Sequence, residues 1–446
     1  MTEMRRFTLV DGLLLIAIVA LAAGTRAGYL ISCADYARNA GPLLVETPPA
    51  ELEKLVSNLK DKQSFASRAP FATEEKETAQ VAPGYPWLVS AVARVVDPAA
   101  RDSTMRWLQC ALGALTAGLY FLFARRAFRS RAVATLTGLF CAAHPFWILD
   151  TAALADGVAA TFLLALSLLL GLRASQTSGP LTSLLFGLSL AALALVRAAF
   201  LPFAFVALAW FLWRSRGLTR GWLCALLAFL GFVNGLAPWT FRNWQLYGEP
   251  VPIVDSAYYH LWIGNNPHAT GGPVSEQAMR DAPVEELSQI PRSTDRYARL
   301  SGLIGQEMHD HPVETVRRRL RAGLDFVFGE RWFIEGRLAD RAGSEESMPT
   351  WLAWSYPVVL ESTLLGLVVL ALLGWRWTYG WRSSALPASL AVFWIPLPYV
   401  LSHAEALSGP RLPLDGVLLC YAAFALACLL PVRGYLWAGE SEADGR

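Results

Sequence analysis

The stretch WLQCALGALTAGLYFLFARRAFRSRAVATLTGLFCAAHPFWIL, residues 107–149, decides the fold class of this 446-residue chain. Two apolar runs, 107–124 and 132–149, enclose a short loop that holds four arginines. Each run approaches the roughly 20 residues that a helix needs to cross the hydrocarbon core of a bilayer. Short arginine-rich loops favour the cytoplasmic side of a membrane. The pattern therefore predicts two transmembrane helices joined on the cytoplasmic side.

The composition of the whole chain agrees with a membrane protein. Hydrophobic residues make up 54% of the sequence, whereas Asp, Glu, Lys and Arg together make up 17%. An average soluble chain has about 25% charged residues, so this chain is a poor match to a soluble enzyme. The net charge of +2 offers no bulk basic field for nucleic acid. The six cysteines show no CxxC or Cys/His spacing typical of zinc or of a redox pair.

Further apolar runs predict an all-α polytopic membrane protein of about ten transmembrane helices. They cover 13–23, 157–172, 181–196, 198–213, 221–239, about 352–374, 385–402 and 412–430, in addition to the two runs above. With ten spans, every short arginine-bearing loop falls on the same side as both termini. We therefore expect a multi-pass protein of the inner or plasma membrane with both termini in the cytoplasm.

The expected organisation has two long extracytoplasmic loops. It runs from a first transmembrane helix (1–32) through a first outer loop (33–103), helices 2–7 (104–239), a second outer loop (240–350) and helices 8–10 (351–430) to a cytoplasmic tail (431–446). Helical spacing of apolar residues in Tyr85–Val96 predicts a surface helix in the first loop. A second helix should begin at Pro312, with an apolar face and a face rich in arginine. It either lies on the membrane surface or packs on the loop with its basic face solvated.

Charged residues gather at the outer ends of the predicted spans. Ionisable groups near hydrocarbon are costly and often functional, although interfacial snorkelling and helix capping also place them there. Carboxylates at such a site can abstract a proton, and arginines can bind phosphate. The candidate residues at this depth are Arg26, Asp35, Tyr36, His144, Asp150, Asp156, Arg197 and Arg411.

Several segments carry a family likeness. They are NLKDKQSFASRAPF…TAQVAPGYPWLVSAV (58–92), HPFWILDTAALADGVAATF (144–162), ALVRAAFLP (194–202), FRNWQLYGEPVPI (241–253), LWIGNNPHATGG (261–272) and GPRLPLDGVLL (409–419). Together they resemble the integral-membrane C-type glycosyltransferases similar to the dolichyl-phosphate-mannose–protein mannosyltransferases. The likeness is to the bacterial branch, which includes the lipid A aminoarabinose transferases.

The resemblance implies an inverting sugar transfer at the extracytoplasmic face. A polyprenyl-phosphate-linked sugar is the donor, and a hydroxyl of a lipid, glycan or protein is the acceptor. A carboxylate of the first outer loop is the general base. Distance from the first span favours Asp35, which Tyr36 follows, whereas distance from Phe65 favours Glu51. Arg197, Arg411 and Arg26 are the candidates for binding the donor phosphate.

The resemblance also suggests secondary roles. Asp156 is a further candidate catalytic residue that would orient the acceptor or sugar, or help to hold a divalent cation. Tyr36, Tyr85, His144 and Asp150 are candidates for substrate binding. Nothing in the sequence requires a metal or another cofactor. Two other functions remain open: a non-catalytic flippase or transporter of polyprenyl-linked sugars, and a scaffold whose outer loops bind a partner. A flippase should carry charge along a central pathway, whereas this chain concentrates charge at one edge.

Overall fold

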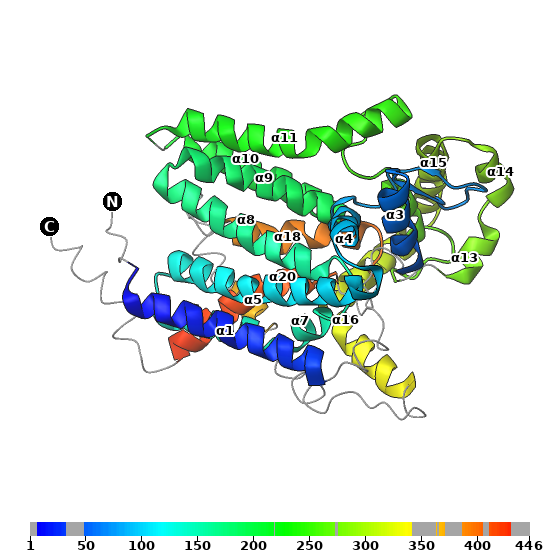
Figure 1. The fold of residues 1–446 in the computed structure, drawn as a ribbon. Coiled ribbons are helices and arrows are strands. Elements are labelled where there is room, and N and C mark those ends of the chain that lie inside the picture. The colour runs from blue at the N-terminus through cyan, green and yellow to red at the C-terminus, as the bar shows by residue number, and fades with distance from the viewer. Residues whose placement is uncertain are drawn as a thin grey trace.

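The computed structural model describes residues 7–32, 49–217, 219–272, 275–340, 363, 365–370, 386–404 and 410–429. Within these ranges almost all secondary structure is helical, and the helices of the membrane part run side by side (Figure 1). Two short strands, β1 (Ala66–Ser67) and β2 (Lys76–Glu77), pair antiparallel, with Ala66 opposite Glu77. The predicted fold class, an all-α polytopic membrane protein, is confirmed.

The membrane part consists of long apolar helices because lipid offers no hydrogen-bond partners, so each backbone group must bond within its own helix. Five described helices are long and apolar enough to span a membrane, two of them with a short 3₁₀ segment at the start: α1 (Leu9–Ser32), η1 (Pro98–Ala100) with α5 (Arg101–Ala127), α8 (Gly157–Thr177), η2 (Ala198–Phe200) with α10 (Leu201–Ser215), and α11 (Gly221–Tyr247). Shorter apolar helices are α6 (Arg131–Ala143), α9 (Pro180–Val196), α18 (Leu386–Trp394) with α19 (Pro396–Leu401), and α20 (Leu412–Leu429). The predicted run 352–374 lies mostly outside the described residues.

Prolines and glycines make the helix bounds differ from the predicted runs. The run 132–149 is two helices, because α6 ends before His144 and a short helix α7 (Pro145–Asp150) follows. Proline favours the first turn of a helix, where its missing N–H costs nothing. Pro396 likewise begins α19. Helix α11 continues eight residues past the predicted end at 239 and stops at Gly248, whose φ of 77° is the left-handed conformation that glycine adopts most readily.

The two outer loops form one folded unit at the end of the bundle opposite the start of α1 (Figure 1). The first loop contributes α3 (Pro49–Asp61), the strand pair and α4 (Gly84–Val95). The second contributes α12 (Ala257–Ile263), α13 (Glu276–Asp281), α14 (Val284–Gln289), α15 (Ser293–Asp310) and α16 (Pro312–Asp340). The loops are joined by hydrogen bonds from Asp255 N to Ala79 O (3.1 Å) and from Ser256 Oγ to Gln80 O (2.7 Å).

Helix α16 turns its apolar stripe outward. Val313 is 77% exposed and Leu320 is 66% exposed. Two of its arginines instead face the protein: Arg318 donates to the Glu307 carboxylate (2.9 Å), and Arg319 donates to the Ser402 carbonyl (3.2 Å). An exposed apolar stripe on a helix at the edge of a membrane bundle favours the first of the two alternatives, a helix that lies on the membrane surface.

A buried carboxylate ties α1 to the turn between α5 and α6. Asp11 and Thr8 form a reciprocal cap, in which each backbone N–H donates to the side chain of the other. The Asp11 carboxylate is fully buried and also accepts from Arg125 Nε (3.1 Å) and Arg131 Nε (2.9 Å). The arginines of the loop that predicted the orientation of the chain therefore also hold its first helix in place.

Removing this carboxylate should destabilise the protein. Asp11→Ala leaves the largely buried Arg125 without this carboxylate, and loss of one member of a buried ion pair typically costs about 3 kcal/mol or more, whereas Arg131 is 44% exposed and adds little. We expect a lower thermal unfolding midpoint in detergent for Asp11→Ala than for the wild type. Asp97→Asn, at an exposed acid outside any such pair, is the control and should leave the midpoint unchanged. An unchanged midpoint in Asp11→Ala would show that the contacts of Asp11 with Arg125 and Arg131 contribute nothing to the stability of the protein.

Candidate active site

A buried ion pair lies between α8 and α9, at the end of the bundle that is predicted to face outward. Arg197 follows the last residue of α9 and donates from Nε to Asp156 Oδ2 (2.7 Å) and from Nη2 to Asp156 Oδ1 (3.1 Å). Asp156 precedes α8 but makes no side-chain cap, because its carboxylate is turned to Arg197. Both side chains are more than nine-tenths buried. A bidentate pair of this kind fixes both groups in orientation.

Asp150 and Tyr85 lie beside this pair. The Asp150 carboxyl group is buried against Gly157, where any Cβ would collide with it. Its Oδ1 has no hydrogen-bond partner among the described residues. Burial, and then the charge of Asp156, raise the pKa of Asp150 to about 8. Tyr85, in the first turn of α4, donates to Gln109 Oε1 (2.9 Å). The sequence-predicted residues Tyr85, Asp150, Asp156 and Arg197 thus form one group, which we call the outer cluster.

A second group, the α20 cluster, consists of His144, Arg411 and Asp415. Arg411 Nε donates to Asp415 Oδ1 (2.8 Å), and one terminal nitrogen donates to the Val327 carbonyl of α16. His144 Nδ1 accepts from the Trp147 backbone N–H, so the proton of a neutral imidazole lies on Nε2. That Nε2 is 3.3 Å from Asp415 Oδ2. Three charged or polar groups at the entry to α20 therefore face one another.

Arg26 has a different setting from the other two arginines. It is fully buried in α1 and donates to the Cys141 and Ala142 carbonyls, both at 3.3 Å. These carbonyls belong to the last turn of α6, and the last carbonyls of a helix have no N–H donor within that helix. Arg26 therefore caps α6, and its Nε has no hydrogen-bond partner among the described residues.

Of the two candidate bases, the structure describes only Glu51. Asp35 and Tyr36 lie outside the described residues. Glu51, in the first turn of α3, accepts from Ser67 Oγ of β1 (3.0 Å). Burial raises the pKa of Glu51 above its usual value. The next residue, Leu52, belongs to the same hydrophobic cluster as Tyr85 and Ala159, and α3 packs against α4, which carries Tyr85 of the outer cluster.

Gln109 and Ser67 contact these candidates but were not predicted from the sequence. Gln109 is buried in α5 and donates to the carbonyls of Thr151 (3.0 Å) and Ala153 (2.6 Å), which fixes the turn between Asp150 and Asp156. A single amide in the apolar run 107–124 was a signal that could have drawn attention to it. Ser67 carries no such signal. Across the described residues, no three His, Cys, Asp or Glu side chains gather as metal ligands.

Comparison with known proteins confirms the family resemblance over part of the chain. The family model described as dolichyl-phosphate-mannose-protein mannosyltransferase matches residues 80–240. That segment contains the whole outer cluster and His144, whereas Arg26, Glu51 and Arg411 lie outside it. A search of curated protein sequences finds no match.

Solved structures of an oligosaccharyltransferase have a similar fold. The apo oligosaccharyltransferase of Archaeoglobus fulgidus aligns with a TM-score of 0.54 at 12% identity, covering 100% of this chain and 53% of that one. The same enzyme tethered to an acceptor peptide with the NVT sequon gives 0.53 at 12% identity, covering 99% and 52%. ArnT from Cupriavidus metallidurans bound to undecaprenyl phosphate gives 0.36 at 15% identity, covering 90% and 77%. The chain thus spans about half the length of the oligosaccharyltransferase. The family match therefore covers residues 80–240, and the structural match shows that the fold of the chain is similar to that of a membrane protein.

The raised pKa of Asp150 predicts a stability that falls as pH rises. Between its ordinary value of 3.8 and its folded value of about 8, the folded state binds one proton more than the unfolded state. Unfolding in that range releases a proton, so each added pH unit costs at most about 1.4 kcal/mol. We expect the thermal unfolding midpoint in detergent to decrease as the pH is raised from 5 to 9. Asp150→Asn should make this decrease smaller. Equal slopes in the two proteins would contradict an ionising Asp150, and Asp97→Asn again serves as the control.

Proposed function

Residues 80–240 match the mannosyltransferase family, and from this premise we propose that the chain moves a sugar from a polyprenyl-phosphate-linked donor to an acceptor hydroxyl on the extracytoplasmic face. One observation carries the proposal. The matched segment buries an arginine and two carboxyl groups together, at the outer ends of apolar helices. A donor with a lipid tail and a phosphate head needs its reacting atoms at this depth, where the tail stays in hydrocarbon.

The proposed transfer inverts the configuration at the anomeric carbon. The acceptor oxygen attacks that carbon while its proton passes to a carboxylate of the first outer loop. The bond from the anomeric carbon to the phosphate oxygen breaks, and the polyprenyl phosphate leaves with the electron pair. Because negative charge grows on the leaving phosphate, fixed cations beside it lower the barrier. The acceptor is a lipid, glycan or protein.

We propose Arg197 and Arg411 as the residues that receive the phosphate. Each is held by a carboxylate, Asp156 or Asp415, so the guanidinium groups are oriented before the donor arrives. A phosphate that binds Arg197 competes with Asp156, and Asp156 is then released toward the sugar or the acceptor. Arg26 is the weaker candidate, because its terminal nitrogens already donate to carbonyls of α6 and α1.

For the general base, the proposal keeps both Asp35 and Glu51. Support for Glu51 comes from its position, since α3 packs against α4, which carries Tyr85 of the outer cluster. Its raised pKa also suits a base, because a more basic carboxylate accepts the acceptor proton more readily. The orientation that this chemistry requires places both termini in the cytoplasm and the two loops outside.

Loss of the base should abolish transfer while leaving the fold intact. Sugar transfer from radiolabelled polyprenyl-phosphate donors is measured in membranes that carry Glu51→Gln or Asp35→Asn. Because general base catalysis contributes roughly 10²- to 10⁴-fold, the variant at the true base should lose about that factor. Glu53→Gln, two residues along α3 in an exposed ion pair with Arg101, is the matched control.

The same assay separates the outcomes. If neither Glu51→Gln nor Asp35→Asn lowers transfer, the proposed base is wrong. If wild-type membranes transfer sugar from no polyprenyl-phosphate donor, the glycosyltransferase proposal itself fails. If Glu51 is the base, transfer should also rise with pH through a pKa above that of an ordinary glutamate, since only the carboxylate is active.

Loss of the Arg197 guanidinium should weaken donor binding. The double variant Arg197→Gln with Asp156→Asn replaces the ion pair by neutral amides of similar size, which avoids leaving one buried charge alone. Polyprenyl phosphate should raise the thermal midpoint of the wild type and should bind the variant roughly 10- to 100-fold more weakly. Ser167→Ala with Ser189→Ala removes another buried polar pair, between α8 and α9, and is the control. Equal affinity in both double variants and the wild type would exclude Arg197 from the phosphate site.

A further inference from the structure

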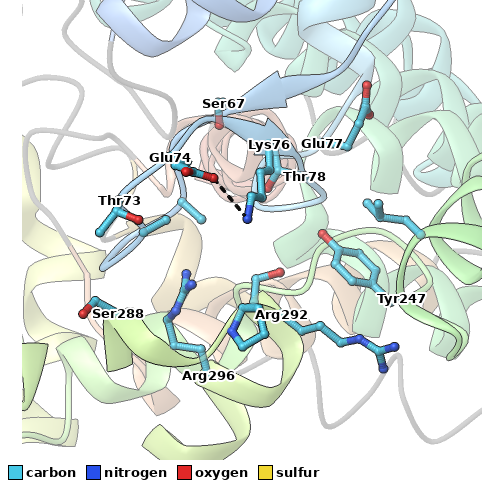
Figure 2. Close-up of a pocket in the computed structure, with 15 residues that line it drawn as sticks. Ser67, Thr73, Glu74, Lys76, Glu77, Thr78, Tyr247, Ser288, Arg292 and Arg296 are labelled. Carbon is cyan, nitrogen blue, oxygen red and sulfur yellow. Dashed lines mark ion pairs between the residues drawn. The ribbon is translucent and has the colours of Figure 1, made fainter. Parts of the chain in front are cut away.

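A polar pocket of about 250 Å³ opens between the two outer loops. The strand pair of the first loop, the last turn of α11 and the start of α15 form its walls (Figure 2). Many of its side chains carry hydroxyl groups: Ser67, Thr73, Thr78, Tyr247, Ser288 and Ser293. None of the residues proposed above for catalysis or phosphate binding lines it. Hydroxyl side chains can donate and accept, so this lining suits a ligand that is itself rich in hydroxyl groups.

The walls of the pocket are held by hydrogen bonds. The Tyr247 hydroxyl accepts from Ala79 N (2.9 Å), and the Ser293 hydroxyl donates to the buried Asp255 carboxylate. Arg296 is buried and donates to the carbonyls of Leu287 (2.9 Å) and Ile290 (2.7 Å), and to Pro70 across the loops (3.2 Å). These bonds connect the two loops around the cavity, so its shape does not depend on a ligand.

Two arginines of the pocket have no carboxylate partner among the described residues: Arg292, and Arg296, which donates to backbone carbonyls. Lys76 pairs with Glu74 (3.3 Å), and Glu77 pairs with Arg242. Arg292 is exposed, and no carboxylate of the described residues pairs with it. Figure 2 shows the backbone of Arg292 across from the strand pair and its guanidinium directed away from the strands, below Tyr247. Arg296 is buried and its donors are already used, whereas Arg292 is exposed and offers the edge of the pocket a positive charge that no described carboxylate balances. A guanidinium binds phosphate or carboxylate with good geometry.

The pocket also adjoins a candidate base. Ser67 lines the pocket, and its hydroxyl donates to Glu51 Oε1 (3.0 Å). Leu52, the next residue, shares a hydrophobic cluster with Tyr85, and α3 packs against α4, which carries Tyr85 of the outer cluster. Glu51 therefore contacts the lining of the pocket through Ser67 and belongs to a helix that packs on α4. An acceptor hydroxyl that took the place of the Ser67 hydroxyl would reach the Glu51 carboxylate.

We propose that this pocket is the acceptor subsite, and that the acceptor is a hydroxyl-rich molecule with a phosphate or carboxylate that pairs with Arg292. The inference rests on the proposed glycosyltransferase function. It assigns the acceptor class, an anionic glycan or lipid head group, which the family match leaves open. The acceptor hydroxyl gives its proton to Glu51 and gains the sugar, while the donor leaves as polyprenyl phosphate.

The first test changes the charge of Arg292. Transfer from a radiolabelled polyprenyl-phosphate sugar is measured against increasing amounts of a detergent extract of envelopes from cells that lack this protein. Arg292→Ala should raise the extract concentration for half-maximal rate about tenfold or more, with the maximal rate within about threefold of the wild type. Arg292→Lys should keep part of the affinity. Arg280→Ala, on α13 in an exposed pair with Glu276 and outside the pocket, should match the wild type. An unchanged half-maximal concentration in Arg292→Ala overturns the assignment.

The second test blocks the pocket without changing its charge. Thr73→Cys is labelled with a maleimide and should then lose transfer to the extract, while polyprenyl phosphate still raises its thermal midpoint. Labelled wild type and labelled Gln277→Cys, at an exposed position of α13, are the controls and should keep transfer. Full transfer by labelled Thr73→Cys would contradict the pocket as the acceptor subsite.

The product of the wild-type reaction tests the acceptor class. The radiolabelled product should bind an anion exchanger and elute with salt, and a neutral product overturns the predicted acceptor. The experiments distinguish failure of the pocket assignment from failure of the proposed glycosyltransferase function. If the wild type transfers sugar but the Arg292 and Thr73 variants behave like it, only the pocket assignment fails. If the wild type transfers sugar from no donor, the function fails and the subsite falls with it.

Discussion

The cost of burying charge beside hydrocarbon governs this structure. A lone ion there is so unfavourable that each charged group needs a partner. Asp156 is matched by Arg197, Asp415 by Arg411, and Asp11 by Arg125 and Arg131. The pairs of Asp156 and Asp11 join segments that are distant in the sequence, so these charges also determine which helices meet, whereas Arg411 and Asp415 pair locally at the start of α20.

The same requirement explains how the outer cluster combines stability with reactivity. A carboxylate holds the guanidinium of Arg197 in one orientation, and burial keeps water from screening its charge. A phosphate can take the place of that carboxylate. Asp150 remains the exception in the cluster, since its Oδ1 has no described hydrogen-bond partner and its raised pKa keeps the group protonated near neutral pH. Buried groups that are left incompletely paired in this way are typical of sites that bind or transform a ligand.

Much of the membrane fold could be predicted from the sequence, because apolar runs and arginine-rich loops report on a bilayer directly. Arg197 is the one charged residue in the stretch 181–213, yet its position was enough to separate α9 from α10. The partner of each charged side chain was harder to predict from the sequence. Arg26 carries the same charge as Arg197 but caps α6, and only the packing of α1 against α6 decides this. The polar pocket draws on residues near 67–78, 246–247 and 288–296, and no pattern within one segment could have joined them.

The contacts of Asp11 with Arg125 and Arg131 have a consequence for the order in which the chain assembles. Asp11 and Arg131 are 120 positions apart, and the two arginines lie on either side of the turn between α5 and α6. During synthesis the first helix emerges long before either arginine exists. Until then the Asp11 carboxylate lacks the two arginines that hold it in the folded protein. The contact that fixes the first helix can therefore form only after the start of α6 has been synthesised.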